Sequence, residues 1–199
     1  MSIRLPTEAR QAEIVSAALL LARETSPPLI TTAEIAEAVG VSQGAVFKHF
    51  ASKDAIWLAA MGWVRAQLLD ALDAAAAGAT RDIDALQSMF DAHIGFVVAH
   101  PGVPRVIFHE LQNPVDSPVK REVRALLQQY RQRLLQRLAA AAQQGEVARG
   151  TDLDAAATLF VGMLQGLVMQ AMTAGQVGAM TAQAGPLFTL YRRAIGGAA

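Results

Sequence analysis

Apolar residues recur at three- and four-residue spacings along almost the whole chain, which is the pattern of amphipathic helices. The first such segment spans residues 7–24, and Ser26-Pro27-Pro28 ends it because proline cannot continue a helix. No alternation with a period of two, which would indicate strands, runs for a useful length. The pattern therefore predicts an all-α fold of about nine helices.

The same spacing predicts the other helices and a division of the chain. Two short helices are expected between Thr31 and His49. Further helices are expected over residues 53–77, from Thr80 or Asp82 to near His100, over a short stretch ending near Leu111, over 118–144, over a segment opened by a capping box of Thr151 and Asp154, and over 181–195. The long segment 53–77 can connect a small N-terminal domain to a larger second one. We therefore expect an N-terminal domain over residues 1–53 and a second domain over 54–199.

The residues that mark helix starts and helix ends are clearest between Thr31 and Lys53. Thr31 and Glu34 have the spacing of a capping box, and Gly40 suits the left-handed residue that ends a helix. Ser42 can cap a second helix of seven or so residues, which Val46 and other apolar residues tie to its neighbours. Two short helices joined by a tight turn, the second one polar on its outer side, form a helix-turn-helix, whose second helix enters the DNA major groove.

At these residues the chain resembles the TetR family of transcriptional regulators. The residues that carry the likeness are Thr32, Ile35-Ala36, Gly40-Val41-Ser42, Gly44, Phe47, His49-Phe50 and Ser52-Lys53. The resemblance implies a DNA-binding head, and it assigns roles to its residues: Gln43 and Ala45 to base edges, Gly44 to close approach, and Thr32, Ser42, Phe47, Lys48, His49 and Lys53 to the backbone of the DNA. Where the family usually has a tyrosine that contacts a phosphate, this chain has Phe47.

Composition and charge qualify this interpretation. The chain has 199 residues, is 53% hydrophobic and contains no cysteine, which excludes disulfides and thiolate metal sites. Its formal net charge is zero, and residues 1–60 carry five basic groups against six acidic ones, so non-specific DNA affinity should be modest. No signal peptide is visible at the N-terminus, and Gln165 and Gln170 interrupt the most apolar run, so we expect a cytoplasmic protein without a membrane segment.

The second domain holds a surplus of apolar residues, which suggests a dimer contact and an effector cavity. In proteins that resemble this one, the last two helices form a four-helix dimer bundle, which here would include Phe160, Gly162, Leu164, Gly166, Leu167, Leu187, Leu190 and Tyr191. The family also binds a small-molecule effector in a helical cavity, for which the bulky candidates are Trp63, Phe90, Phe96, Val106, Phe108 and Met163. Burial inside the monomer is the alternative interpretation for both sets.

Histidines and arginines offer two further hypotheses. His93, His100 and His109 could belong to a metal site, but no compact ligand motif is present, so solvated or hydrogen-bonded histidines are favoured and we expect no metal and no cofactor. Five arginines between Arg121 and Arg137 could form a second nucleic-acid surface, although such charges more often coat a solvated helix face.

Together with these patterns, the resemblance to the TetR family implies a homodimeric repressor that binds a palindromic double-stranded DNA operator and leaves it when a small molecule binds the second domain. The chain shows no nucleophile elbow, phosphate-binding loop or dinucleotide fingerprint, so we expect no enzyme. Two alternatives stay open. One is a helical ligand- or partner-sensing protein that does not use DNA, and the other is a metal-dependent hydrolase.

Overall fold

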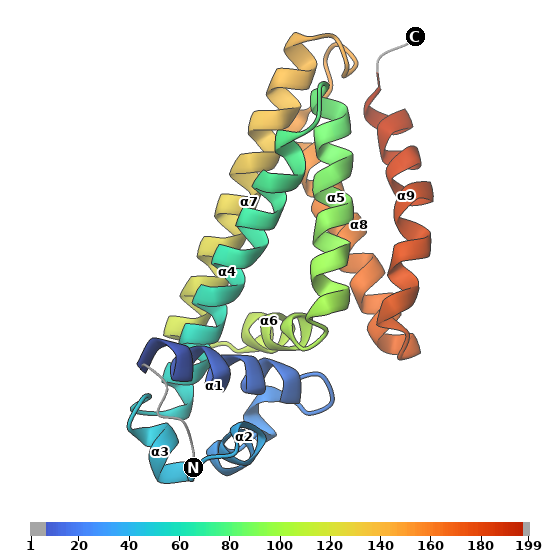
Figure 1. Ribbon diagram of the computed structural model, residues 1–199. Helices are drawn as coiled ribbons and strands as arrows, with labels where there is room; N and C mark the ends of the chain where they lie inside the picture. The colour runs from blue at the N-terminus through green and yellow to red at the C-terminus, as the bar shows by residue number, and fades with distance from the viewer. Residues whose placement is uncertain (1–6, 197–199) are drawn as a thin grey trace. The chain divides into compact units, whose positions relative to one another are not determined.

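The computed structural model describes residues 7–196, and helices account for its regular structure (Figure 1). The helices are α1 (Thr7–Leu21), α2 (Thr32–Val39), α3 (Gln43–Phe47), α4 (Lys53–Ala77), α5 (Asp82–Ala99), α6 (Val103–Gln112), α7 (Pro118–Gln143), α8 (Leu153–Ala174) and α9 (Met180–Ile195), with the 3₁₀ turns η1 (Pro27–Leu29) and η2 (Val177–Ala179). Between residues 7 and 196 the only β pairing is an isolated antiparallel bridge of Val147 with Gly196. The predicted all-α fold is confirmed.

The chain divides into two compact units. The first comprises the chain up to Ala66 together with His100–Ala125, and the second comprises Gln67–Ala99 and the chain from Leu126 onward. Both α4 and α7 begin in the first unit and end in the second. The first unit is therefore larger than a helix-turn-helix head, because it also holds α6 and the start of α7.

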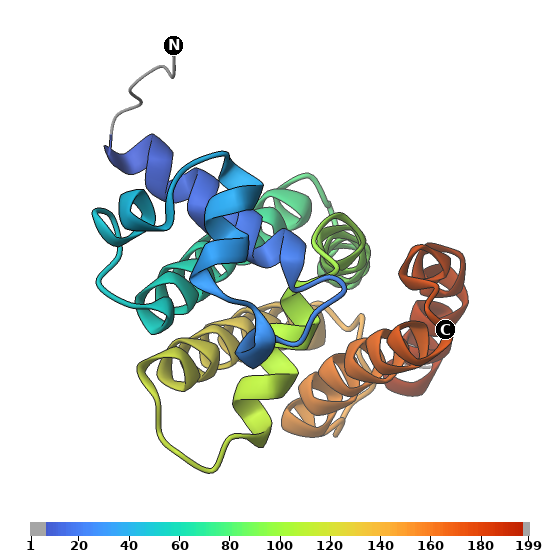
Figure 2. The same cartoon turned by 90° about the horizontal axis from the view of Figure 1, so that it is seen from below.

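The first unit packs α1, α2, α3 and the start of α4 around a small apolar core (Figure 2). Ile14, Ile35, Val46 and Ile56 contribute one side chain from each helix, and none of the four is exposed to solvent. Burying an aliphatic side chain of this size contributes about 1.5–3 kcal/mol. This cluster fixes the short helix α3, which is too short to be stable by itself.

Helix α6 is joined to the C-terminal end of α1 by backbone proximity and by one arginine. A Cβ atom placed on Gly102 would lie 2.0 Å from the carbonyl oxygen of Leu19, so only glycine allows this approach. Arg105 donates hydrogen bonds to the carbonyl oxygens of Ala22 (3.0 Å) and Arg23 (3.2 Å). These carbonyls lie at the end of α1, where backbone acceptors lack partners within the helix.

The second unit has an aromatic core formed by α5, α8 and α9. The ring centroids of Phe90 and Phe160 are 5.3 Å apart in an edge-to-face contact, and Phe160 lies 5.6 Å from Tyr191. Phe188 packs against all three rings. The buried Tyr191 hydroxyl donates to the carbonyl oxygen of Ala156 at 3.1 Å, so the one polar atom of the cluster is satisfied.

The arginines of α7 pair with carboxylates. Arg131 contacts Asp154 (2.6 Å), Arg133 contacts Asp73 (2.8 Å) and Arg137 contacts Asp82 (3.1 Å). Near the start of the helix, Arg121 and Arg124 both contact Asp116. Each of the five arginines thus has a carboxylate partner, with Asp116 shared by two of them, which agrees with the interpretation as a solvated helix face and argues against a second nucleic-acid surface.

One expectation about α8 needs correction. Asp152 caps the helix by accepting hydrogen bonds from the amides of Asp154 and Ala155, so the helix starts without the expected capping box at Thr151. Aspartate competes well for this role because its carboxylate also suits the positive end of the helix dipole. Helix α8 is also the one helix within residues 7–196 that is long and apolar enough to cross a membrane, with a mean hydropathy of 1.5, and core helices of folded proteins pass the same test.

Candidate nucleic-acid interface

The expected caps build the helix-turn-helix. The Thr31 hydroxyl accepts a hydrogen bond from the Glu34 amide (3.2 Å), and the Glu34 carboxylate accepts one from the Thr31 amide (2.7 Å), which is a complete capping box. The hydrogen bonds that the Thr31 amide and hydroxyl donate to the Glu34 carboxylate hold the pKa of Glu34 below its usual range. Gly40 ends α2 with φ 73°, and the Ser42 hydroxyl accepts from the Ala45 amide at 3.2 Å. Local sequence thus fixes both helix starts and the turn between them.

Helix α3 presents polar and aromatic groups to solvent. Gln43, Gly44 and Lys48 are exposed, and the Phe47 ring is 48% exposed. Val46 on the opposite side is completely buried, as predicted. A five-residue helix with one buried anchor and an open outer surface can be offered to a DNA groove.

Gln43 is held in place by a neighbouring side chain. Its amide nitrogen donates to the Thr32 hydroxyl at 2.7 Å, which ties the first residue of α3 to the first turn of α2. The sequence assigned these residues to separate roles, one to a base edge and one to a phosphate. Their hydrogen bond links the two roles, because it orients the glutamine amide before any DNA is present.

Lys53 has partners inside the protein that sequence reasoning missed. Its ammonium group donates to the carbonyl oxygens of Pro28 (2.8 Å) and Ile30 (3.0 Å), which lie more than 20 residues earlier in the chain. These carbonyls belong to the segment that leads into α2. The lysine at the start of α4 thus fastens the entry of the helix-turn-helix, and no local pattern could have indicated this.

His49 lies just after α3 and is half-buried. Its carbonyl oxygen accepts a hydrogen bond from the Gln11 side chain at 3.1 Å, which ties this end of α3 to α1. Its ring nitrogen Nδ1 is buried, and no hydrogen-bond partner for it lies within residues 7–196. The ring is therefore positioned by packing and by its own backbone.

Comparisons with known proteins agree with this geometry. Residues 14–60 match the family described as bacterial regulatory proteins, tetR family, and residues 113–184 match the tetracyclin repressor-like C-terminal domain. The chain belongs to the TetR family of transcriptional regulators. Members of this family are DNA-binding regulators, and the second match covers the C-terminal domain that follows the DNA-binding domain.

Individual relatives of this TetR-family regulator are distant. The nucleoid occlusion factor SlmA of Alteromonas mediterranea is 31% identical over 99 residues, which cover 49% of this chain and 50% of that protein. The chain thus spans about half the length of the curated relatives it matches. The fatty acid degradation regulator FadR from Bacillus halodurans superposes with a TM-score of 0.82 at 19% identity, covering 96% of this chain and 97% of that one. FadR from Bacillus subtilis, solved with stearoyl-CoA, gives 0.81 at 18% identity, with 92% and 98% covered; both likenesses show the fold.

The predicted effector residues of this regulator are spread over both units. Trp63, Val106 and Phe108 belong to the first unit, whereas Phe90, Phe96 and Met163 belong to the second. Phe90 is completely buried within the aromatic core, and its place in an effector pocket stays a prediction. Phe96 is 8% exposed, and Trp63, Phe108 and Met163 are half-buried. Val106 alone of the six lines a cavity described below.

The predicted dimer residues also fall into two groups. Phe160, Leu164, Leu167 and Tyr191 are each at most 3% exposed, because they pack inside the chain itself, and their part in a dimer contact stays a prediction. Gly162 and Leu190 are exposed, and Gly166 and Leu187 are half-buried. Leu159 and Met169, which the sequence did not single out, are 45% and 49% exposed on α8.

The three candidate metal-binding histidines have separate surroundings. The His93 ring lies 3.1 Å from the Tyr130 hydroxyl, and burial lowers the pKa of His93 to about 4. His100 packs edge-on against Trp63 with centroids 5.1 Å apart, and partial burial lowers its pKa as well. His109 lines the cavity described below. No group of three potential ligands is assembled anywhere between residues 7 and 196.

Proposed function

We propose that this TetR-family regulator works in the cytoplasm as a homodimeric repressor that binds a palindromic operator through α3 and is released by a small molecule. The proposal rests on the two sides of α3, one buried and one exposed to solvent. One side is anchored by Val46, and the other offers Gln43, Gly44 and Lys48 to solvent. The role needs no catalytic step.

DNA docking is proposed to divide between base and backbone contacts. Gln43 can pair bidentately with adenine through its carbonyl oxygen and its second amide hydrogen while it keeps the hydrogen bond to Thr32, and Ala45 contacts a thymine methyl group. Phosphates are contacted by Lys48, His49, Lys53 and Thr32, and Phe47 packs against the sugar backbone. Gly44 and the Ser42 cap let the helix start approach the groove closely.

Dimerisation is proposed to use the outward faces of α8 and α9, which lie side by side (Figure 1). Leu159, Gly162, Gly166 and Met169 follow one another at spacings of three and four, so they share one face of α8. A Cβ atom on either glycine would meet no atom within 4 Å, which leaves room for a partner helix. Leu190 on α9 is 61% exposed and extends this apolar surface. A two-fold pair of heads suits two successive major grooves.

The effector is proposed to be a small molecule that binds one conformation of the dimer better than the other. Acyl-CoA thioesters are the first compounds to test, because the FadR structure with the same fold was solved with stearoyl-CoA. The effector-binding residues stay a prediction for Trp63, Phe90, Phe96, Phe108 and Met163.

The proposal is tested by the salt dependence of DNA binding. The substrate is duplex DNA from the region next to the gene, with unrelated DNA of equal length for comparison. Lys48→Ala should weaken binding to both and reduce the slope of log K against log salt by about 1, because one phosphate contact is lost. Lys48 is chosen over Lys53, whose ammonium also holds the head together.

Arg121→Ala is the matched control, since it removes one positive charge from α7 where Asp116 already pairs with it. It should leave affinity and slope unchanged. Gln43→Ala should relax the preference between the two DNAs more than it lowers non-specific affinity. Equal slopes for the Lys48 variant and the unchanged protein, or binding without site preference, would favour the sensing protein that does not use DNA.

A further inference from the structure

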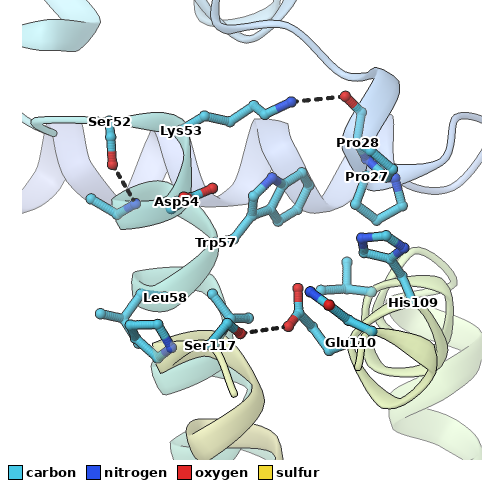
Figure 3. Close-up of a pocket in the computed structure, with 15 residues that line it drawn as sticks. Pro27, Pro28, Ser52, Lys53, Asp54, Trp57, Leu58, His109, Glu110 and Ser117 are labelled. Carbon is cyan, nitrogen blue, oxygen red and sulfur yellow. Dashed lines mark hydrogen bonds between the residues drawn. The ribbon is translucent and has the colours of Figure 1, made fainter. Parts of the chain in front are cut away.

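A cavity of about 520 Å³ lies within the first unit, apart from the outer surface of α3. Its walls come from η1, the first two turns of α4, α6 and the start of α7 (Figure 3). The volume falls in the range of small-molecule sites. Neither the family match nor the proposed roles of α3, α8 and α9 account for it.

The apolar part of the wall is built from rings and branched side chains. Trp57 is 5% exposed, and Val106 and Val119 are 2% and 4% exposed. Pro27 and Pro28 close the side formed by η1. In Figure 3 the indole of Trp57 points into the space that Pro27 and His109 border. Such a wall suits the apolar body of a ligand, and an indole face also attracts cations.

The charged part of the wall is acidic. Asp54 comes from the first turn of α4 and Glu110 from α6, and in Figure 3 the Glu110 carboxylate points into the same space as Trp57. One oxygen of Glu110 accepts a hydrogen bond from the Ser117 hydroxyl at 2.8 Å, which fixes the carboxylate and leaves its second oxygen to face a ligand.

The one lysine of the wall does not balance these carboxylates within the cavity. Lys53 directs its ammonium to the carbonyl oxygens of Pro28 (2.8 Å) and Ile30 (3.0 Å). With that ammonium group bound to backbone oxygens, the side chains that remain to meet a ligand include two carboxylates, a histidine, an amide and an indole. An anion would meet repulsion from both acidic side chains, whereas a cation would meet attraction.

We propose that this cavity is a binding site for an organic ammonium ion with an apolar body, held by Glu110 and Asp54 against the indole of Trp57. Charge-assisted hydrogen bonds to the carboxylates would orient the ammonium group. The apolar body would lie on Val106, Val119 and the prolines. The site is a property of the free protein, so it stands whether or not the proposed DNA docking is correct.

The test is isothermal titration calorimetry of the full chain with three probes of one size and different charge. These are 3-phenylpropylammonium, 3-phenylpropan-1-ol and 3-phenylpropionate. We expect saturable binding of the ammonium at one site per chain, about tenfold weaker binding of the alcohol, and no measurable binding of the carboxylate. Binding of the carboxylate as tightly as the ammonium, or no saturable binding of the ammonium, would overturn the proposal.

Variants locate the site. Glu110→Gln and Asp54→Asn should each weaken the ammonium by about three- to tenfold while leaving the alcohol unchanged, since each removes a charge and keeps the shape. Glu37→Gln, an exposed change on α2 outside the wall, is the matched control and should behave like the unchanged protein. Saturation-transfer NMR on the unchanged protein supplies the second measurement if a variant unfolds. Contacts from the aromatic ring of the probe to Trp57 support the site, and contacts elsewhere contradict it.

Discussion

Replacing Gly102 by alanine tests how α6 is attached to the head. The backbone of Gly102 has φ −74° and ψ −25°, which alanine adopts without strain, so any effect must come from contact. The new Cβ atom would lie 2.0 Å from the carbonyl oxygen of Leu19 and 3.0 Å from the amide nitrogen of Arg23. Carbon and oxygen atoms approach to about 3.3 Å, so α6 and α1 must separate by about 1.3 Å. Both obstacles are backbone atoms, which cannot rotate away.

That separation also breaks the contacts of Arg105. Its hydrogen bonds to α1 are 3.0 and 3.2 Å long, and a shift of this size takes them beyond bonding distance. Overpacking costs about 1–3 kcal/mol, and hydrogen bonds from a charged donor contribute about 1.5 kcal/mol or more. Together we expect a loss of about 3 kcal/mol, which lowers the Tm of a chain of this size by about 6–12 °C.

Thermal unfolding followed by circular dichroism measures this loss. Gly62→Ala is the matched control, because Gly62 lies within α4 of the same unit and a Cβ atom there would meet nothing within 4 Å. Alanine favours a helix by about 1 kcal/mol over glycine, so this variant should be slightly more stable. An unchanged Tm for Gly102→Ala would refute the reasoning, because the two helices would then be free to separate at no cost.

Three further outcomes can be measured. Leu190→Glu should shift the chain from dimer to monomer in light scattering, since a two-fold contact would bring two buried charges together, whereas Gln136→Glu on the exposed side of α7 should not. Burial lowers the pKa of His93 from 6.5 to about 4, so the unfolded chain binds a proton on this residue more readily than the folded chain does. The free energy of unfolding should therefore be highest above pH 6.5 and fall by up to about 3 kcal/mol towards pH 4. In urea titrations at several pH values, His93→Gln should flatten this decrease. Phe47→Tyr should tighten operator binding by about 0.5–1.5 kcal/mol in gel shifts by adding a phosphate hydrogen bond, and equal affinity would place that ring away from the phosphate.

The features that sequence predicted well are those that depend on neighbours in the chain. The capping box of Thr31 and Glu34, the left-handed Gly40 and the Ser42 cap all involve residues within three positions of their partners. A side chain of fixed length can reach only a few backbone groups at such short separation, so the residue types determine the contact. The helix-turn-helix can therefore be predicted from the sequence without a structure.

What each apolar helix face packs against was harder to predict. In α8 the residues at apolar spacing do form the buried side, but spacing alone did not say whether that side packs inside the chain or against a second copy. The structure buries Phe160, Leu164 and Leu167 and turns Leu159 and Met169 outward. The dimer contact itself stays a prediction, and Leu159 and Met169 are the large apolar side chains that α8 leaves open to a partner.

Contacts between distant segments could not be predicted at all, and those made by Lys53 change how its role is interpreted. A lysine in the first turn of a helix opposes the helix dipole, which by itself indicated a partner such as a phosphate. Two carbonyl groups supply that partner within the protein, at 2.8 and 3.0 Å. An ammonium group has three donors, so one remains for a phosphate in the proposed docking, and the two internal bonds would hold it in place. Removing Lys53 would then loosen the entry to α2 and remove a DNA contact together. For that reason a loss of affinity in Lys53→Ala cannot separate folding from binding, whereas Lys48→Ala can.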